Sequence, residues 1–131
     1  MKTSAALTLL VVDDNPHIRR IISAWAVAMR FNVSCACDGR EAISFLITRQ
    51  FDLVLTDFDM PGMNGSDLLN WIRKHRPSVP VCMMSAAAAS EVFRAKVRPC
   101  VDGLLAKPFS AAALDSCVKE ALLQKAAPFP G

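Results

Sequence analysis

Residues 51–62 read FDLVLTDFDMPG, an apolar run that places Asp57 at its end with an acidic turn directly after it. Two further apolar runs also end in charged side chains: Leu7 to Val12 in the pair Asp13-Asp14, and Gly103 to Ala106 in Lys107. If these runs are parallel strands, their ends open onto one edge of a sheet, where α/β proteins bind ligands. Three carboxylates and one ammonium group would therefore lie close together.

Such a cluster of carboxylates is unfavourable by itself. Two carboxylates about 4 Å apart repel by about 4 kcal/mol at an effective dielectric constant of about 20. A divalent cation among Asp13, Asp14 and Asp57 would remove this repulsion, and Mg²⁺ suits carboxylate oxygens together with water. The pattern predicts a magnesium site with a nucleophilic or phosphate-accepting aspartate beside it.

Apolar runs and helical patterns alternate five times along the chain. The runs cover residues 7–12, 32–37, 51–57, 79–85 and 102–107, and helical patterns cover 16–30, 42–47, 67–75, 88–98 and the region after Ser110. Short connections between the units predict an α/β domain, in which right-handed crossovers cover both faces of a parallel sheet.

Composition excludes several classes of protein. The chain has 131 residues, 53% hydrophobic and 21% charged, which argues against disorder, and its net charge of +3 is too small to indicate nucleic-acid binding. No apolar stretch is long enough to span a membrane, and no signal-peptide cleavage site follows the first apolar run. Five cysteines, an odd number without zinc-ligand spacing, predict reduced thiols and a cytoplasmic protein.

Four groups of residues, in this order, carry a resemblance to a known family. They are Val11 to Asn15, Asp57 with Met60 to Gly65, Ser85-Ala86, and Asp102-Gly103 with Lys107 to Phe109. The chain resembles the receiver domain of two-component response regulators, with residues 1–126 as the domain and 127–131 as a tail or truncated linker. The resemblance implies a flavodoxin-like (βα)5 three-layer sandwich whose five-stranded parallel sheet has the order 2-1-3-4-5.

The resemblance also implies a role for each residue of the magnesium site. Asp57 is the implied phosphoryl acceptor and also contacts the metal. Asp14 is the implied direct Mg²⁺ ligand, Asp13 a more indirect one, and the backbone carbonyl of Asp59 a further one, with Mn²⁺ as an expected substitute. The side chain of Asp59 is equally consistent with a turn that faces solvent.

Two further residues complete the implied site. Ser85 resembles the hydroxyl that captures a phosphoryl oxygen, and Lys107 resembles the ammonium that pairs with it. The bond between Lys107 and Pro108 resembles a peptide that is usually cis in the family. These residue types suit phosphoryl transfer, which depends on positioning and on neutralising the charge of the equatorial oxygens.

The implied function is phosphorelay signal transduction. A histidine kinase or a His-containing phosphotransfer protein would pass a phosphoryl group to Asp57 in a Mg²⁺-dependent reaction, and the phosphorylated domain would change its binding to a partner. The domain would catalyse its own phosphotransfer and dephosphorylation without being a classified enzyme. We expect a monomer or weak homodimer without nucleic-acid or membrane contacts. An output partner is expected on the face formed by the helix over 88–98, the strand over 102–107 and the helix after Ser110.

Two departures from the family pattern fall on that output face. Leu104 stands where receivers often carry Tyr or Phe at the switch position, and the chain has no Tyr. Pro99-Cys100 replaces a small Ala-Gly pair that is common before the last strand. The implied active site is complete, whereas its coupling to a partner is expected to differ.

Two alternative functions remain. A magnesium phosphatase of the haloacid-dehalogenase type carries an Asp-x-Asp motif, which Asp57-Phe58-Asp59 imitates. In that class the motif lies near the N-terminus and the acidic pair comes last, whereas here Asp13-Asp14 comes first and no cap insertion is present. A pseudo-receiver that binds partners without phosphorylation is disfavoured because every implied site residue is present.

Overall fold

A computed structural model describes residues 6–126, so the expected tail at 127–131 lies outside the described residues. The strands are β1 (Thr8–Val12), β2 (Asn32–Ala36), β3 (Leu53–Asp57), β4 (Val81–Ser85) and β5 (Gly103–Ala106). The helices are α1 (Pro16–Ala28), α2 (Gly39–Thr48), α3 (Gly65–His75), α4 (Glu91–Val97) and α5 (Ala111–Ala126), with 3₁₀ turns η1 (Ala86–Ala89) and η2 (Arg98–Cys100). No helix within residues 6–126 is long and apolar enough to cross a membrane.

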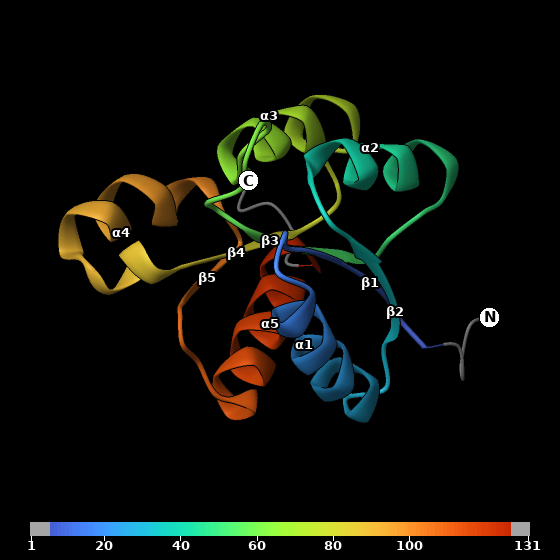
Figure 1. The fold of residues 1–131 in the computed structure, drawn as a ribbon, viewed down its shortest axis with the longest axis horizontal. Helices are drawn as coiled ribbons and strands as arrows, with labels where there is room; N and C mark the ends of the chain where they lie inside the picture. Colours follow the sequence, from blue (N-terminus) through green and yellow to red (C-terminus); the bar gives the residue numbers. More distant parts are fainter. Residues whose placement is uncertain (1–5, 127–131) are drawn as a thin grey trace.

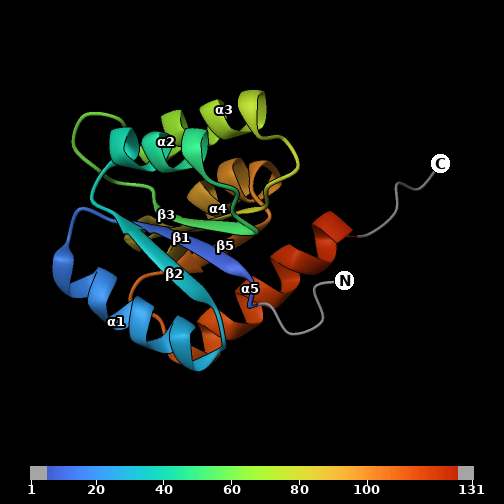
Figure 2. The same ribbon diagram turned by 90° about the vertical axis from the view of Figure 1, so that its right-hand side faces the viewer.

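The five strands form one parallel sheet in the order β2-β1-β3-β4-β5, which confirms the predicted fold and strand order. Helices α1 and α5 cover one face, and α2 and α3 cover the other, with α4 beside β4 and β5 (Figures 1 and 2). Val12 pairs with Ala36 of β2 and with Thr56 of β3, so the ends of these strands lie level. The segments that follow β1 and β3 therefore start at the same edge.

Alternate residues of each strand enter two separate cores. In β1, Leu9 and Val11 pack with α1 and α5, whereas Leu10 and Val12 pack with α2 and α3. Every residue of β3 and of β4 is buried, as expected for central strands covered on both faces. Each such aliphatic side chain contributes about 1.5–3 kcal/mol, so the central strands form a stable base for the residues at their ends.

The segment after β4 differs from the predicted helix over 88–98. Residues 86–89 form η1, and α4 begins only at Glu91, because the Ser90 side chain accepts a hydrogen bond from the Phe93 amide and caps a new helix. The Ser85 hydroxyl similarly accepts from the Ala87 amide and starts η1. Local capping therefore overrides the high helix propensity of the alanine run.

Two other helix boundaries also differ from the sequence pattern. Helix α1 ends at Ala28 rather than near Arg30, because Arg30 takes a positive φ of 72°. The Phe31 amide then bonds the Ala26 carbonyl and closes the helix end with a Schellman motif. Helix α3 begins at Gly65, two residues before the predicted start, because Asn64 and Asp67 form a reciprocal capping box.

Candidate functional site

Three carboxylates meet at the edge of the sheet where β1 and β3 end. Asp13 and Asp14 follow β1 directly, and Asp57 is the last residue of β3. One carboxylate oxygen from each lies within 4.8 Å of the other two, and Asp13 and Asp57 are only 1% and 5% exposed. The oxygens of an octahedral Mg²⁺ site lie about 3–4 Å apart, so small side-chain adjustments would bring these three into one coordination sphere.

Lys107 reaches this cluster from the loop after β5. Its Nζ lies 2.8 Å from Asp13 Oδ2 and 3.2 Å from Asp57 Oδ1, and its peptide bond to Pro108 is cis, as the resemblance implied. Burial alone would lower the pKa of Lys107, but the hydrogen bonds and charges of Asp13 and Asp57 outweigh it and raise the pKa. The ammonium group is therefore firmly charged and neutralises part of the acidic cluster.

The pKa of Asp57 is raised, as expected for a buried carboxyl group close to another carboxylate. Burial raises the pKa of its carboxyl group, and the nearby charge of Asp13 raises it further, while Lys107 acts in the opposite direction. Desolvation and like charge both disfavour the ionised form. A bound cation would relieve both effects, because it adds positive charge where the repulsion is greatest.

Asp13 is held in place through all of its acceptor groups. Its Oδ1 accepts from the Asn15 amide at 2.9 Å, its Oδ2 pairs with Lys107, and its carbonyl accepts from Arg19 Nη1 at 2.6 Å. Asp14 is exposed, and its carboxylate has no hydrogen-bond partner among residues 6–126. Sequence reasoning did not anticipate Arg19, because nothing in a helical pattern indicates that a side chain folds back onto the preceding loop.

Gly65 allows the loop after β3 to fold back against the end of that strand. A Cβ atom at this position would lie 2.5 Å from the Asp57 carbonyl oxygen and 2.7 Å from Phe58 Cα, both of them backbone atoms. The Gly65 amide donates to the Phe58 carbonyl at 2.9 Å. Gly65 belongs to the motif that carried the resemblance, but only the structure shows that its missing side chain positions Asp57.

Ser85 and Asp59 contact each other beside the carboxylate cluster. Ser85 ends β4, is fully buried, and donates its hydroxyl hydrogen to Asp59 Oδ2 at 3.2 Å. The side chain of Asp59 is exposed to solvent, as one of the two expectations had it, and it also contacts Ser85, although it is not one of the three clustered carboxylates. The metal-ligand role of its backbone carbonyl remains a prediction.

Asp102 is a structural residue rather than a member of the site. Its carboxylate accepts from the Val81 amide at 2.8 Å and from Arg73 at 3.1 Å, at the start of β4 and β5. These contacts fix the two strands to each other at the edge opposite the carboxylate cluster. The Asp102-Gly103 part of the motif therefore supports the fold.

Leu104, at the expected switch position, is half-buried. Leu104 packs against the core shared by α2 and α3, together with Phe58 and Val97. Phe58, which follows Asp57, instead makes an aromatic contact with Phe93 of α4. Their ring centroids lie 5.0 Å apart at an angle of 85°, the edge-to-face geometry.

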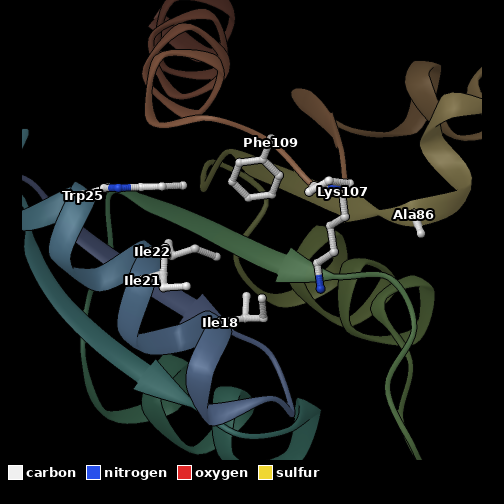
Figure 3. Close-up of a pocket in the computed structure, with 8 residues that line it drawn as sticks. Ile18, Ile21, Ile22, Trp25, Ala86, Lys107 and Phe109 are labelled. Carbon is white, nitrogen blue, oxygen red and sulfur yellow. The ribbon is translucent and has the colours of Figure 1, made fainter.

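An apolar groove lies next to the ammonium of Lys107. A cavity of about 410 Å³ runs between α1 and the loop after β5, and Trp25 and Phe109 contact each other along it, with centroids 6.2 Å apart. Figure 3 shows the α1 side chains on one side and Phe109 on the other. Its lining residues are Ile18, Ile21, Ile22, Trp25, Ala86, Lys107, Pro108 and Phe109.

Comparison with known proteins gives a consistent set of similarities. The family described as the response regulator receiver domain matches residues 9–119. Chemotaxis protein CheY-3 of Vibrio cholerae is 39% identical over 111 residues, which cover 82% of this chain and 85% of that protein.

Solved structures of response regulator proteins show a similar fold. Chemotaxis protein CheY4 of Vibrio cholerae superposes with a TM-score of 0.82 at 27% identity, covering 89% of this chain and 99% of that one. Response regulator protein TrrA of Thermotoga maritima, solved in complex with Mg²⁺-BeF, gives 0.78 at 27% identity, covering 88% and 98%.

Proposed function

Because the chain belongs to the receiver-domain family of two-component response regulators, we propose that Asp57 is the residue that accepts the phosphoryl group. The observation that carries this proposal is the position of Asp57, with its carboxylate within 4.8 Å of Asp13 and Asp14 and 3.2 Å from Lys107 Nζ. Asp13 is also buried, clustered and paired with Lys107, but both of its carboxylate oxygens already accept hydrogen bonds, from the Asn15 amide and from Lys107.

The acidic cluster is the proposed magnesium site. Asp14 suits direct coordination because its carboxylate is exposed and unpaired among the described residues, whereas both oxygens of Asp13 already accept hydrogen bonds. Asp13 therefore suits contact through water, and Mn²⁺ is the proposed substitute. The bound cation would supply charge neutralisation for the incoming phosphoryl oxygens.

The chain's own residues account for the remaining steps. An Asp57 carboxylate oxygen attacks the phosphorus in line, an O–P bond forms, and the N–P bond of the donor phosphohistidine breaks. Lys107 pairs with one phosphoryl oxygen, and the Ser85 hydroxyl donates to another. Water later reverses the modification by attack on the same phosphorus, so the domain catalyses its own phosphorylation and dephosphorylation.

The donor is proposed to dock along α1 and the adjacent groove. Ala24 and Val27 are exposed on α1, with Val27 61% exposed, and the groove leads to Lys107. A small, apolar helix surface suits a helical bundle that carries a phosphohistidine, either a histidine kinase or a phosphotransfer protein. The output partner is proposed to bind the separate face formed by α4, β5 and α5.

Mass spectrometry tests the proposed acceptor. Incubation with acetyl phosphate and Mg²⁺ should add about 80 Da as a hydroxylamine-labile acyl phosphate. Asp57→Asn should abolish this labelling, whereas Asp115→Asn, a matched change on α5 away from the cluster, should leave it unchanged. Undiminished labelling of Asp57→Asn would contradict the proposal, because another residue would then carry the phosphoryl group.

A further inference from the structure

The Ser85 hydroxyl already donates its one hydrogen in the unphosphorylated chain. It donates to Asp59 Oδ2 at 3.2 Å and accepts from the Ala87 amide at 3.1 Å. A hydroxyl group has only one hydrogen to donate. That hydrogen is the one that a phosphoryl oxygen on Asp57 would require, so Asp59 and a phosphoryl group compete for Ser85.

Asp59 is placed to make this competition effective. It lies two residues after the proposed acceptor, its carboxylate forms no ion pair among residues 6–126, and a hydrogen bond to a carboxylate is stronger than one to a neutral acceptor. Once Ser85 turns to the phosphoryl group, the exposed carboxylate of Asp59 exchanges this donor for water and lies near a group of the same charge. Both effects oppose the phosphorylated arrangement.

We infer that Asp59 is a positioning residue that latches the Ser85 hydroxyl away from the phosphoryl group and thereby lowers the stability of the phosphorylated state. This inference rests on the proposed function of Asp57. It gives the Asp59 side chain a role distinct from metal binding, because the residue lies outside the cluster of Asp13, Asp14 and Asp57.

The latch also connects the site to the segment that follows β4. The oxygen of Ser85 accepts from the first turn of η1, so a reoriented hydroxyl changes the support of the Ala87 amide. Helix α4 follows directly and contains no buried residue. Release of the latch therefore acts on the least anchored helix of the fold and requires no aromatic ring at Leu104.

A double-mutant cycle tests the latch. The apparent affinity for Mg²⁺-beryllofluoride, an analogue of the phosphoryl group, should rise about three- to tenfold in Asp59→Ala and less in Asp59→Asn, which keeps an acceptor without the charge. In the Ser85→Ala background, Asp59→Ala should give no such gain. Asp115→Ala serves as the control carboxylate and should leave the affinity unchanged.

Two outcomes of the affinity measurement would overturn the latch. An equal gain from Asp59→Ala in the wild-type and Ser85→Ala backgrounds would show that Asp59 acts through its charge alone. No gain from Asp59→Ala in the wild-type background would show that the hydrogen bond to Ser85 does not affect the affinity. Amide exchange at Ala87, measured without Mg²⁺ or beryllofluoride, should be faster in Asp59→Ala than in the wild type. Because this readout needs no phosphoryl group, it tests the latch even if the labelling experiment at Asp57 fails, and unchanged exchange would contradict it.

Discussion

The edge of the sheet that carries the carboxylates and the segment from Ala86 to Cys100 are neighbours with opposite properties. Asp13, Asp57 and Ser85 are almost completely buried and fixed by short polar contacts, whereas α4 has no buried residue and depends on 3₁₀ turns at both ends. Elements that move in signalling come from the less stable parts of a fold. The difference indicates a rigid chemical site beside a responsive segment.

The largest expected effect on stability comes from a change at the edge of the sheet that carries the carboxylates. Gly65→Ala places a Cβ against the backbone of Asp57 and Phe58, neither of which is free to move, so we expect a loss of about 2–3 kcal/mol in the free energy of unfolding and impaired phosphorylation. Urea denaturation and acetyl phosphate labelling measure the two effects. Gly62→Ala is the matched control, because its Cβ would meet nothing within 4 Å and only its positive φ adds about 1 kcal/mol of strain.

Magnesium should raise the free energy of unfolding through the carboxylate cluster, by less than Gly65→Ala lowers it. At a free Mg²⁺ concentration ten times its dissociation constant, mass action adds about 1.4 kcal/mol to the free energy of unfolding, which thermal melts detect. Asp14→Ala should weaken this response and should raise the melting temperature of the metal-free protein, because one repulsive charge is removed. A melting curve unaffected by millimolar Mg²⁺ would refute the metal site.

In the segment from Ala86 to Cys100, Phe93→Ala should loosen the structure locally. Removing the edge-to-face contact with Phe58 costs about 1 kcal/mol, and hydrogen exchange should accelerate over residues 86–100 while acetyl phosphate labelling of Asp57 stays normal. Val92→Ala on the same helix is the control, since Val92 is 72% exposed. If Phe93→Ala also lowered acetyl phosphate labelling severalfold, the carboxylate site and residues 86–100 would not be separable.

The smallest expected change is at the switch position. On phosphorylation, hydrogen exchange should change at Ser85 to Ala89 and hardly at Leu104 to Ala106, because Leu104 has no ring to reorient. Leu104→Tyr should alter the coupling to an output partner without changing acetyl phosphate labelling. A large change in exchange centred on β5 in the wild type would show that leucine transmits the signal, and would remove the contrast between the regions.

The same contrast explains which features the sequence could predict. Strand ends follow from long apolar runs, so the meeting of Asp13, Asp57 and Lys107 was predictable from their places in the chain. The start of α4 was not predictable, because the cap at Ser90 competes with a strong helix-forming alanine run. Nor was the contact between Asp59 and Ser85, because hydrogen bonds between loop side chains leave no periodic signal.

The groove beside α1 also gives the protein a built-in optical probe. The chain has no tyrosine and two tryptophans. Trp25 lies in the groove, and Trp71 lies on the opposite face of the sheet. The ring of Trp71 stacks on that of His75, with the two ring centroids 4.4 Å apart. Trp71→Phe would leave Trp25 as the single indole emitter. Its emission wavelength would then report whether water or a docked donor helix fills the groove, without any attached dye.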